Sequence, residues 1–388
     1  MDLHLILQII FWLLAGLFII PFAIYPALMA LIGRLIPSVR FEERVTDDDL
    51  PEVTIIVAAY NEEQGIRATI QSLLEQDYPE DKILIKVFSD GSVDDTDRLV
   101  RGLAEEHSQV SLTRFERRGK TECQNLMVEK TNSEILAFCD GGATWQQRTL
   151  RSLVEPMVRS GNVAVTTGRL VLQRAGSDDV NLGNEGLFRK VDEIIKRGES
   201  ALKVTIGVNG PVYAVRRNQY VRLNAAMVSD LALPVLVLAR GKRVVHVARA
   251  IAHEASLADV WQDFARKRRI ITQGLVSLGL LSRAVLAARR PLLVVAFFGH
   301  KVLRWFGSVL ALAALIISFM LWPNPLYVWL DIIVAGFVML SGIGLALMTD
   351  GKRAGLLKAP AYFVLGNLAS LAALTDYARG KRKATWQQ

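Results

Sequence analysis

Cysteine and histidine are scarce in this chain of 388 residues, which has two cysteines and five histidines. Cys123 and Cys139 both fall in segments that read as core helix or strand. Neither a disulfide framework nor a cysteine-based metal site fits such a pattern, and a reducing compartment suits these thiols. Internal repeats and low-complexity tracts are also absent.

Acidic residues are fewer than basic ones, 38 against 46, which gives a net charge of +8. The basic excess is spread along the chain and includes the ends of apolar runs, where it would attract anionic lipid head groups. We therefore expect membrane lipids, and no nucleic acid, among the partners. A hydrophobic share of 51% and a mean hydropathy of +0.28 are too high for one ordinary soluble domain.

The first segment has almost no charge, because His4 is the one residue between Leu3 and Gly33 that can be charged near neutral pH. A bilayer crossing needs roughly 20 apolar residues. Residues 1–36 are therefore expected to form an N-terminal transmembrane helix. A cleaved signal peptide is the alternative, but the run is long, contains Pro21 and Pro26, and lacks both a basic start and a small-residue cleavage site.

Residues 37–288 have the composition of a soluble domain in which short β-branched runs alternate with amphipathic stretches. This alternation is typical of the α/β class, with a mainly parallel sheet covered by helices. Strands are expected at 53–59, 83–88, 110–115 and 134–139, and helices at 62–76, 94–107 and 120–130.

Apolar character returns in the C-terminal membrane region, residues 289–378, within the stretches 291–322, 326–348 and 356–374. We expect an interfacial helix before Phe306, a first crossing from about Gly307, a second crossing, and a last segment that either lies at the interface, re-enters, or crosses.

Basic residues set the expected orientation, because they favour the cytosolic side of a membrane. They flank the soluble domain and fill the tail 379–388, whereas the turn at Pro323 and Pro325 has none. The soluble domain and the tail are therefore expected to be cytosolic, in a multi-pass protein of the cell membrane, such as a bacterial inner membrane. The basic residues are Arg34, Arg40, Arg266, Lys267, Arg268, Arg269, Lys352, Arg353, Arg379, Lys381, Arg382 and Lys383.

Polar residues follow the first two expected strands directly. Tyr60, Asn61 and Glu62 come after the first, and Asp90 lies in a Ser-Asp-Gly-Ser turn after the second. Open α/β sheets bind ligands at the carboxyl ends of their strands, so these side chains are candidates for holding a nucleoside. The alternatives are a helix cap made by Asn61 and a purely conformational turn at Asp90.

Further charged residues fall at similar positions. Lys120 opens a helix where a diphosphate would meet backbone donors, and Asp140 ends the fourth strand as a candidate metal ligand. Asp230, near the start of a later helix, is either an N-cap or a base for an acceptor hydroxyl. Arg266 and Arg269 form either a solvated or lipid-facing basic face or a diphosphate clamp.

The order of these features resembles the membrane branch of the family 2 glycosyltransferases, which includes cellulose, hyaluronan and poly-N-acetylglucosamine synthases, over roughly 53–279. The resemblance implies a GT-A type, Rossmann-like nucleotide-sugar domain. It implies that Asp140 begins the Asp-x-Asp metal motif and that Asp230 is the general base. It also implies that Tyr60, Asn61, Glu62, Asp90 and Lys120 hold the donor, with Arg269 in the position of the arginine of the Gln-x-x-Arg-Trp motif.

Three departures from the family pattern concern the metal and the acceptor. Gly142 stands where the second acid of Asp-x-Asp is expected, so we expect diphosphate oxygens, water, or His253 or Glu254 to complete the metal site. Ser229 replaces the acid before Asp230, and Ile270 replaces the tryptophan that stacks on the acceptor sugar.

The resemblance implies an inverting hexosyltransferase that uses a UDP-sugar and a divalent metal ion, Mg²⁺ or Mn²⁺. The acceptor is either a growing polysaccharide, as in exopolysaccharide biosynthesis, or a lipid that receives one sugar. A homo-oligomer or a partner subunit would help to complete a polymer channel. A third reading is a donor-binding regulatory subunit with weak catalysis, which the departure at Gly142 permits.

Overall fold

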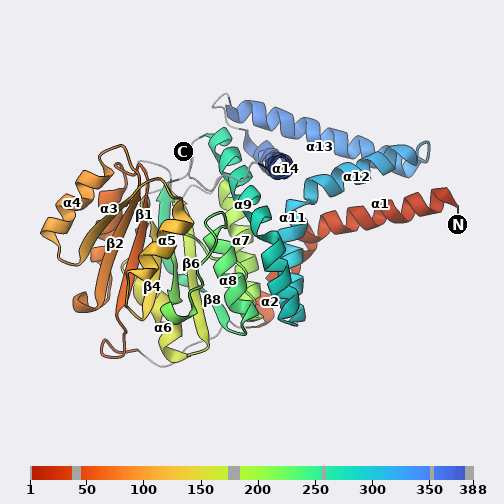
Figure 1. The fold of residues 1–388 in the computed structure, drawn as a ribbon. Coiled ribbons are helices and arrows are strands. Elements are labelled where there is room, and N and C mark those ends of the chain that lie inside the picture. Colours follow the sequence, from red (N-terminus) through yellow and green to blue (C-terminus); the bar gives the residue numbers. More distant parts are fainter. Residues whose placement is uncertain (1, 37–44, 174–183, 256–258, 350–353, 381–388) are drawn as a thin grey trace.

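The computed structural model describes residues 2–36, 45–173, 184–255, 259–349 and 354–380, and for 184–188 the backbone alone (Figure 1). Arg40, Lys352, Arg353 and the tail from residue 381 onward therefore lie outside the described residues. The strands are β1 (Val53–Ala59), β2 (Ile83–Asp90), β3 (Val110–Phe115), β4 (Ile135–Asp140), β5 (Ala143–Trp145), β6 (Val163–Gln173), β7 (Tyr213–Arg216) and β8 (Arg243–Ala255).

The strands form one sheet in the order β3-β2-β1-β4-β7-β6-β8-β5. The first four strands in this order run parallel, β7 is antiparallel to both of its neighbours, and β6 and β8 are parallel. The expected α/β class with a mainly parallel sheet is confirmed. β1 and β3 have the expected bounds, whereas β2 ends two residues later than expected, at Asp90.

The soluble helices are α3 (Ile66–Leu74), α4 (Thr96–Glu106), α5 (Lys120–Glu129), α6 (Thr149–Arg159), α7 (Asn184–Ala201) and α8 (Ser229–Ala239). The first of these was expected to begin at Glu62, but α3 begins at Ile66 because 60–65 form a loop. Asn61 adopts a left-handed φ of 53° in this loop, and the N-cap of α3 is Gly65. The helix-cap alternative for Asn61 is therefore wrong.

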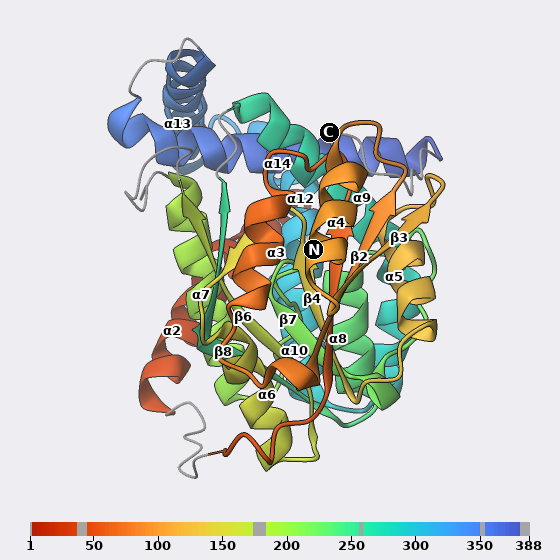
Figure 2. The same ribbon diagram turned by 90° about the vertical axis from the view of Figure 1, so that its left-hand side faces the viewer.

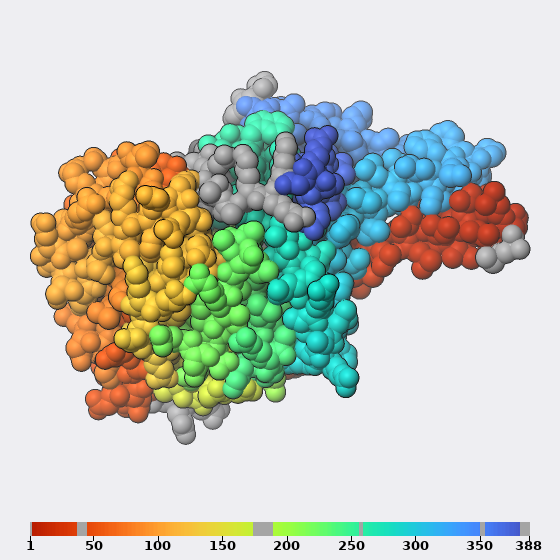
Figure 3. Space-filling model, viewed as in Figure 1, coloured from red at the N-terminus to blue at the C-terminus, as the bar shows by residue number. Residues whose placement is uncertain are grey.

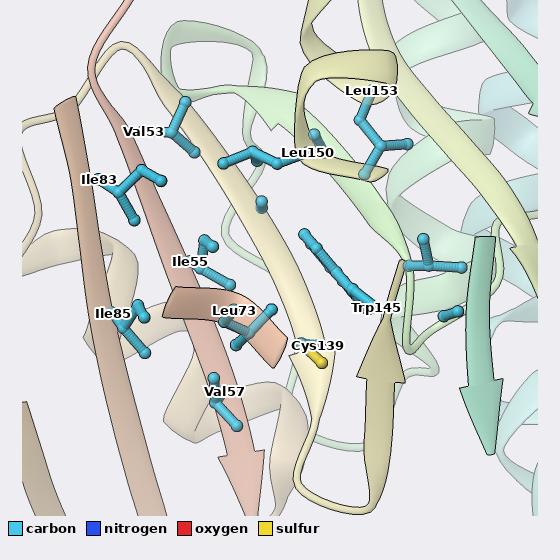
Figure 4. Packing of buried hydrophobic residues seen from close by; sticks show 14 of the residues in the cluster. Val53, Ile55, Val57, Leu73, Ile83, Ile85, Cys139, Trp145, Leu150 and Leu153 are labelled. Carbon is cyan, nitrogen blue, oxygen red and sulfur yellow. The ribbon is translucent and has the colours of Figure 1, made fainter. Parts of the chain in front are cut away.

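Buried side chains fill both faces of the sheet. β1 is buried at every residue, as expected of a central parallel strand covered on two sides. Its alternate residues Val53, Ile55 and Val57 pack beneath α3 and α6, as Figure 4 shows, and Ile56 and Ala58 face the layer of α5 and α8. Full burial of one such aliphatic side chain contributes about 1.5–3 kcal/mol.

The apolar helices are α1 (Leu3–Ile19), α2 (Tyr25–Leu35), α9 (Val260–Ala287), α10 (Pro291–Ala296), α11 (Leu303–Trp305), α12 (Gly307–Met320), α13 (Pro325–Thr349) and α14 (Lys358–Ala378). A π-helical turn, Ile20–Ile24, joins α1 to α2 at Pro21, which lacks the N–H needed for a regular helix. A second one, η4 (Phe297–Val302), joins α10 to α11.

Among the described residues, four helical segments are long and apolar enough to cross a membrane: 3–35, α9, α13 and 355–378. The pair 291–305 and 307–320 bends by 65°, so α12 begins at the residue from which a crossing is expected. In Figure 1, α1, α12 and α13 extend side by side away from the sheet, whereas α14 is seen end-on. Figure 2 reverses this, with α13 end-on and α14 lengthwise, and Figure 3 shows the same projecting bundle. The last apolar helix therefore lies across the direction of α13, which favours the interfacial alternative.

The membrane helices are joined to the soluble domain through α2 and α7. Gly198 of α7 lies so close to α2 that an added Cβ would be 2.4 Å from the carbonyl oxygen of Met29. Tyr25, Met29 and Ile195 form a small buried cluster at the same junction. This contact fixes the hydrophobic N-terminal segment against the sheet.

Replacing Gly198 with alanine should therefore separate α7 from α2 and lower the free energy of unfolding by about 1–3 kcal/mol, because backbone atoms cannot yield to the new methyl group. Thermal unfolding of the purified protein in a neutral detergent measures the effect. The matched control is Gly102→Ala in α4, where an added Cβ meets nothing within 4 Å and helix propensity rises. Equal unfolding temperatures for the two variants would contradict the prediction.

Candidate active site

Four carboxylates gather at the carboxyl ends of β1, β4 and β8. Glu62 follows β1, Asp140 ends β4, Glu254 lies near the end of β8, and Asp230 is on the first turn of α8. Burial, followed by the negative charges of Asp140 and Glu254, raises the pKa of Glu62 to about 7. The arrangement thus concentrates negative charge in a place where water is largely excluded.

Lys120 supplies the positive charge at the centre of this group. Its side chain is 16% exposed and forms an ion pair with Asp140. Burial favours the neutral amine, but the carboxylates of Asp140, Asp230 and Glu254 more than offset this effect and raise the pKa of Lys120. Lys120 is therefore a cation held between acids, at the N-terminus of α5.

Asp230 lies in α8 after the N-cap residue Val228, so the N-cap alternative is wrong. Its Ser229 neighbour donates a hydrogen bond to Oδ1 over 3.3 Å. Gly210 is packed against the carboxylate, since an added Cβ would be 2.5 Å from Oδ2. Burial raises the pKa of Asp230, and Asp140 adds to this while Lys120 opposes it. A raised pKa brings this carboxyl group closer to the range in which a base accepts protons.

The glycine at position 142 has a local physical reason. A Cβ at Gly142 would be 3.1 Å from Oε2 of Glu62, and one at Gly141 would be 3.0 Å from Cγ of the same side chain. The carboxylate of Glu62 therefore occupies space beside the position where the second acid of Asp-x-Asp is expected. This packing was not foreseen from the sequence, because it depends on the loop that follows β1.

His253 and Glu254 lie within β8, paired with β5, and not after a strand as expected. The two side chains point to opposite faces. His253 contacts Gln146, with 3.2 Å between Nε2 and the amide nitrogen, and burial lowers its pKa. Glu254 is the residue that interacts with Glu62 and Lys120. The prediction of His253 as a metal ligand beside Asp140 is thus not supported by its position, whereas Glu254 is well placed.

The basic run on α9 divides into two pairs. Arg266 faces Glu254, with 3.7 Å between Nη2 and Oε2, and Arg269 interacts electrostatically with Asp140. Lys267 pairs with Asp263 on the same helix, and Arg268 makes a two-pronged ion pair with Asp376 of α14. Arg266 and Arg269 therefore lie beside the carboxylates, where a diphosphate clamp is expected. Arg268 instead links α9 to α14.

The residues expected to hold a nucleoside lie on the β1 and β2 side of this group. The Arg117 guanidinium stacks on the ring of Tyr60 at 3.2 Å from its centroid, and Asn61 accepts a hydrogen bond from the amide of Val93 at 3.0 Å. Asp90 is 1% exposed. Its carboxylate accepts from the amides of Arg118 and Gly119, at 2.7 and 3.0 Å. In this conformation Asp90 positions the loop that leads to Lys120.

The tertiary structure thus brings Glu62, Lys120, Asp140 and Asp230 together, and it adds Glu254, Arg266 and Arg269. Tyr60, Asn61 and Asp90 form a neighbouring group. Within the described ranges, no three acidic, histidine or cysteine side chains form a ready-made metal cage. A cation there would need further oxygen ligands.

Residues 54–220 match the model of the family described as Glycosyl transferase family 2. The chain is similar to glycosyltransferase AglE of Haloferax volcanii, with 29% identity over 113 residues, which are 29% of this chain and 37% of AglE. It is also similar to the probable glycosyltransferase YdaM of Bacillus subtilis, with 21% identity over 287 residues, which are 70% of this chain and 67% of YdaM.

Among solved structures, the mannosyltransferase PcManGT of Pyrobaculum calidifontis, determined in complex with GDP-Man and Mn²⁺, has a TM-score of 0.68 and 20% identity. The match covers 97% of this chain and 99% of PcManGT, so the two share a fold over their whole lengths, apolar helices included. The family match, the similar proteins and the shared fold are all consistent with the group of charged side chains at the carboxyl ends of the strands. Residues 54–220 therefore form a domain that matches Glycosyl transferase family 2, within a chain that shares its fold with a solved mannosyltransferase.

Proposed function

We propose that this protein transfers a hexose, with inversion, from a UDP-sugar to a hydroxyl group of a membrane-associated acceptor. The observation that carries the proposal is the position of Asp230, a partly buried carboxylate with a raised pKa, beside Lys120 and Asp140. One group can accept a proton while the neighbouring cation faces a leaving diphosphate.

The reaction is a single displacement. The acceptor oxygen attacks the anomeric carbon and forms the new C–O bond, while the bond from that carbon to the diphosphate oxygen breaks. The acceptor proton passes to the Asp230 carboxylate, and the bonding electron pair leaves with UDP. Lys120, Arg266 and Arg269 neutralise the negative charge that grows on the diphosphate, which is worth several kcal/mol in sites of this type.

A divalent metal ion, Mg²⁺ or Mn²⁺, fits the remaining acids. Oε2 of Glu254 is buried and, among the described residues, has no hydrogen-bond partner, and Glu62 lies beside Asp140. Asp140 and Glu254 would hold the ion together with diphosphate oxygens and water, the ligand set that Mg²⁺ prefers. Bound there, it would screen the charge of the leaving group.

The acceptor is proposed to come from the membrane, with the active site on the cytosolic side. α9 leads from the active site into the apolar helices, and its Arg268 is tied to α14. The helices α1, α12 and α13, which lie side by side in Figure 1, provide little material for a self-contained polymer channel. We therefore favour a lipid-linked acceptor over a long polysaccharide. Gel analysis of the radiolabelled product separates one added sugar from a polymer.

Asp230→Asn should lower the transfer rate by about 100-fold or more, because the amide cannot accept the proton. Donor binding should be nearly unchanged, since the site for the diphosphate is intact. Release of UDP from a panel of UDP-sugars measures transfer, and equilibrium binding of UDP measures the donor site. Transfer by this variant at the wild-type rate would remove Asp230 as the base. Wild-type protein that binds UDP but never transfers would instead support a regulatory subunit.

Gly210→Ala tests the position of the same base. The new methyl group would be 2.5 Å from Oδ2 of Asp230, so the carboxylate must move, and a displacement of about 1 Å lowers rates by about 100-fold. The control is Gly161→Ala, where an added Cβ meets nothing within 4 Å. Steady-state rates of both variants check the prediction, and similar rates would contradict it.

The metal site is tested by the adjacent residues of β8. Glu254→Gln should raise the Mg²⁺ or Mn²⁺ concentration for half-maximal activity by roughly tenfold, because a charged ligand is lost. His253→Gln should leave this concentration unchanged, since His253 faces the other side of the strand. A chelator should abolish transfer by the wild-type protein. A metal requirement that responds to His253 and not to Glu254 would reverse the assignment.

A further inference from the structure

A second group of charges, buried or partly buried, lies between α7 and the adjoining segments η4 and α11, beside the apolar helices. Its cations, here called the basic cluster, are Lys196, Lys301 and Arg304. Lys196 is 5% exposed and pairs with Asp192 at 2.7 Å, and it donates to Asn209. Arg304 donates to the carbonyl oxygen of Pro21 at 3.2 Å. For the Lys301 ammonium group, neither a hydrogen bond nor an ion pair is found within the described part of the chain.

The acids near the basic cluster, Asp192 and Glu199, carry less negative charge than its three cations carry positive charge. Lys301 is repelled by Arg304 and by Lys196 and attracted by Asp192 and by Glu199. Asp192 already forms its close contact with Lys196. The other nearby acid, Glu199, is fully buried and accepts hydrogen bonds from Tyr25 and His300, at 2.9 and 2.8 Å. A bound anion would therefore relieve the mutual repulsion of three cations, of which Lys196 is buried and Lys301 and Arg304 are partly buried.

The basic cluster and Asp230 contact the same short loop. The Lys301 ammonium group is close to Gly207, since an added Cβ would be 3.8 Å from Nζ. Gly210, three residues later, is packed against the Asp230 carboxylate. Lys196 interacts electrostatically with Asp230 as well. An acceptor that places a hydroxyl group at Asp230 would thus have an adjoining anionic group within reach of Lys301.

The location of Lys301 indicates how such an anion arrives. Lys301 lies on η4, six residues before the start of α12 at Gly307. Arg304 is bound to the hinge between α1 and α2, so the basic cluster is placed where the apolar helices meet the soluble domain. Lipid phosphate groups occupy the same depth in a bilayer.

We propose that Lys301, together with Lys196 and Arg304, binds the phosphate group of a lipid-linked acceptor and so aligns the acceptor hydroxyl with Asp230. This inference rests on the proposed function and specifies its substrate class. A neutral glycolipid acceptor would leave the three cations of the basic cluster facing two acids, Asp192 and Glu199. A phosphate-linked acceptor would engage it through charge-assisted hydrogen bonds, which are the strong ones.

The test compares dodecyl phosphate with dodecanol, which share a chain and differ in the headgroup. Each is titrated into the purified full-length protein in neutral detergent, with inorganic phosphate as a third probe. Wild-type protein should bind dodecyl phosphate at least about tenfold more tightly than either of the others. Lys301→Gln should lose this preference and Lys301→Arg should restore it. Lys190→Gln, an exposed site on α7, is the matched control and should retain the preference.

Equal affinity of the wild-type protein for dodecyl phosphate and dodecanol would overturn the inference without reference to any variant. Equal affinity for inorganic phosphate would also overturn it, because the site would then hold a free anion and not a lipid. Binding does not depend on turnover. A protein that turns over UDP-sugars without phosphate preference refutes the lipid phosphate site alone, whereas phosphate preference without any sugar transfer refutes the proposed function alone.

Discussion

The buried ammonium group of Lys120 makes the active site possible. Glu62, Asp140, Asp230 and Glu254 come from four different parts of the chain, and each interacts with this one cation. Without it, four acids in a poorly hydrated place would repel one another or take up protons. Lys120 begins α5, and Asp90 holds the preceding loop through the Arg118 and Gly119 amides, so the group around Asp90 and the group around Lys120 share this contact.

A second group of interacting charges lies where the apolar helices meet the sheet domain. Gly198 permits close contact between α7 and α2, and this contact carries Tyr25 to Glu199 and brings η4 against α7. Helices that begin in the apolar bundle thereby help to place charged side chains next to the loop that holds Asp230. The proposed acceptor site would then lie at the interface that joins the apolar helices to the sheet, where polar groups stand in place of apolar packing that would be more stable.

Much of the site was predictable because parallel strands deliver their carboxyl ends to one edge. The sequence alone placed Glu62, Asp90, Lys120 and Asp140 just after strands or at the start of a helix, and the sheet order brings them together. His253 and Glu254 are both candidate metal ligands by sequence, and their adjacent positions do not distinguish them. The choice depends on which face of β8 each side chain occupies, and that is fixed by pairing with β5 and β6.

Hydrophobic patterning by itself determined the fold class, the apolar segments and the start of α12 at Gly307, because these depend on the local period and length of apolar runs. Tertiary structure alone decided that α14 lies across α13, that Glu62 fills the space beside Gly142, and that Lys301 reaches the loop of Asp230. These are contacts between residues far apart in the chain. They arise from how helices and strands pack, and local sequence patterns do not predict such packing.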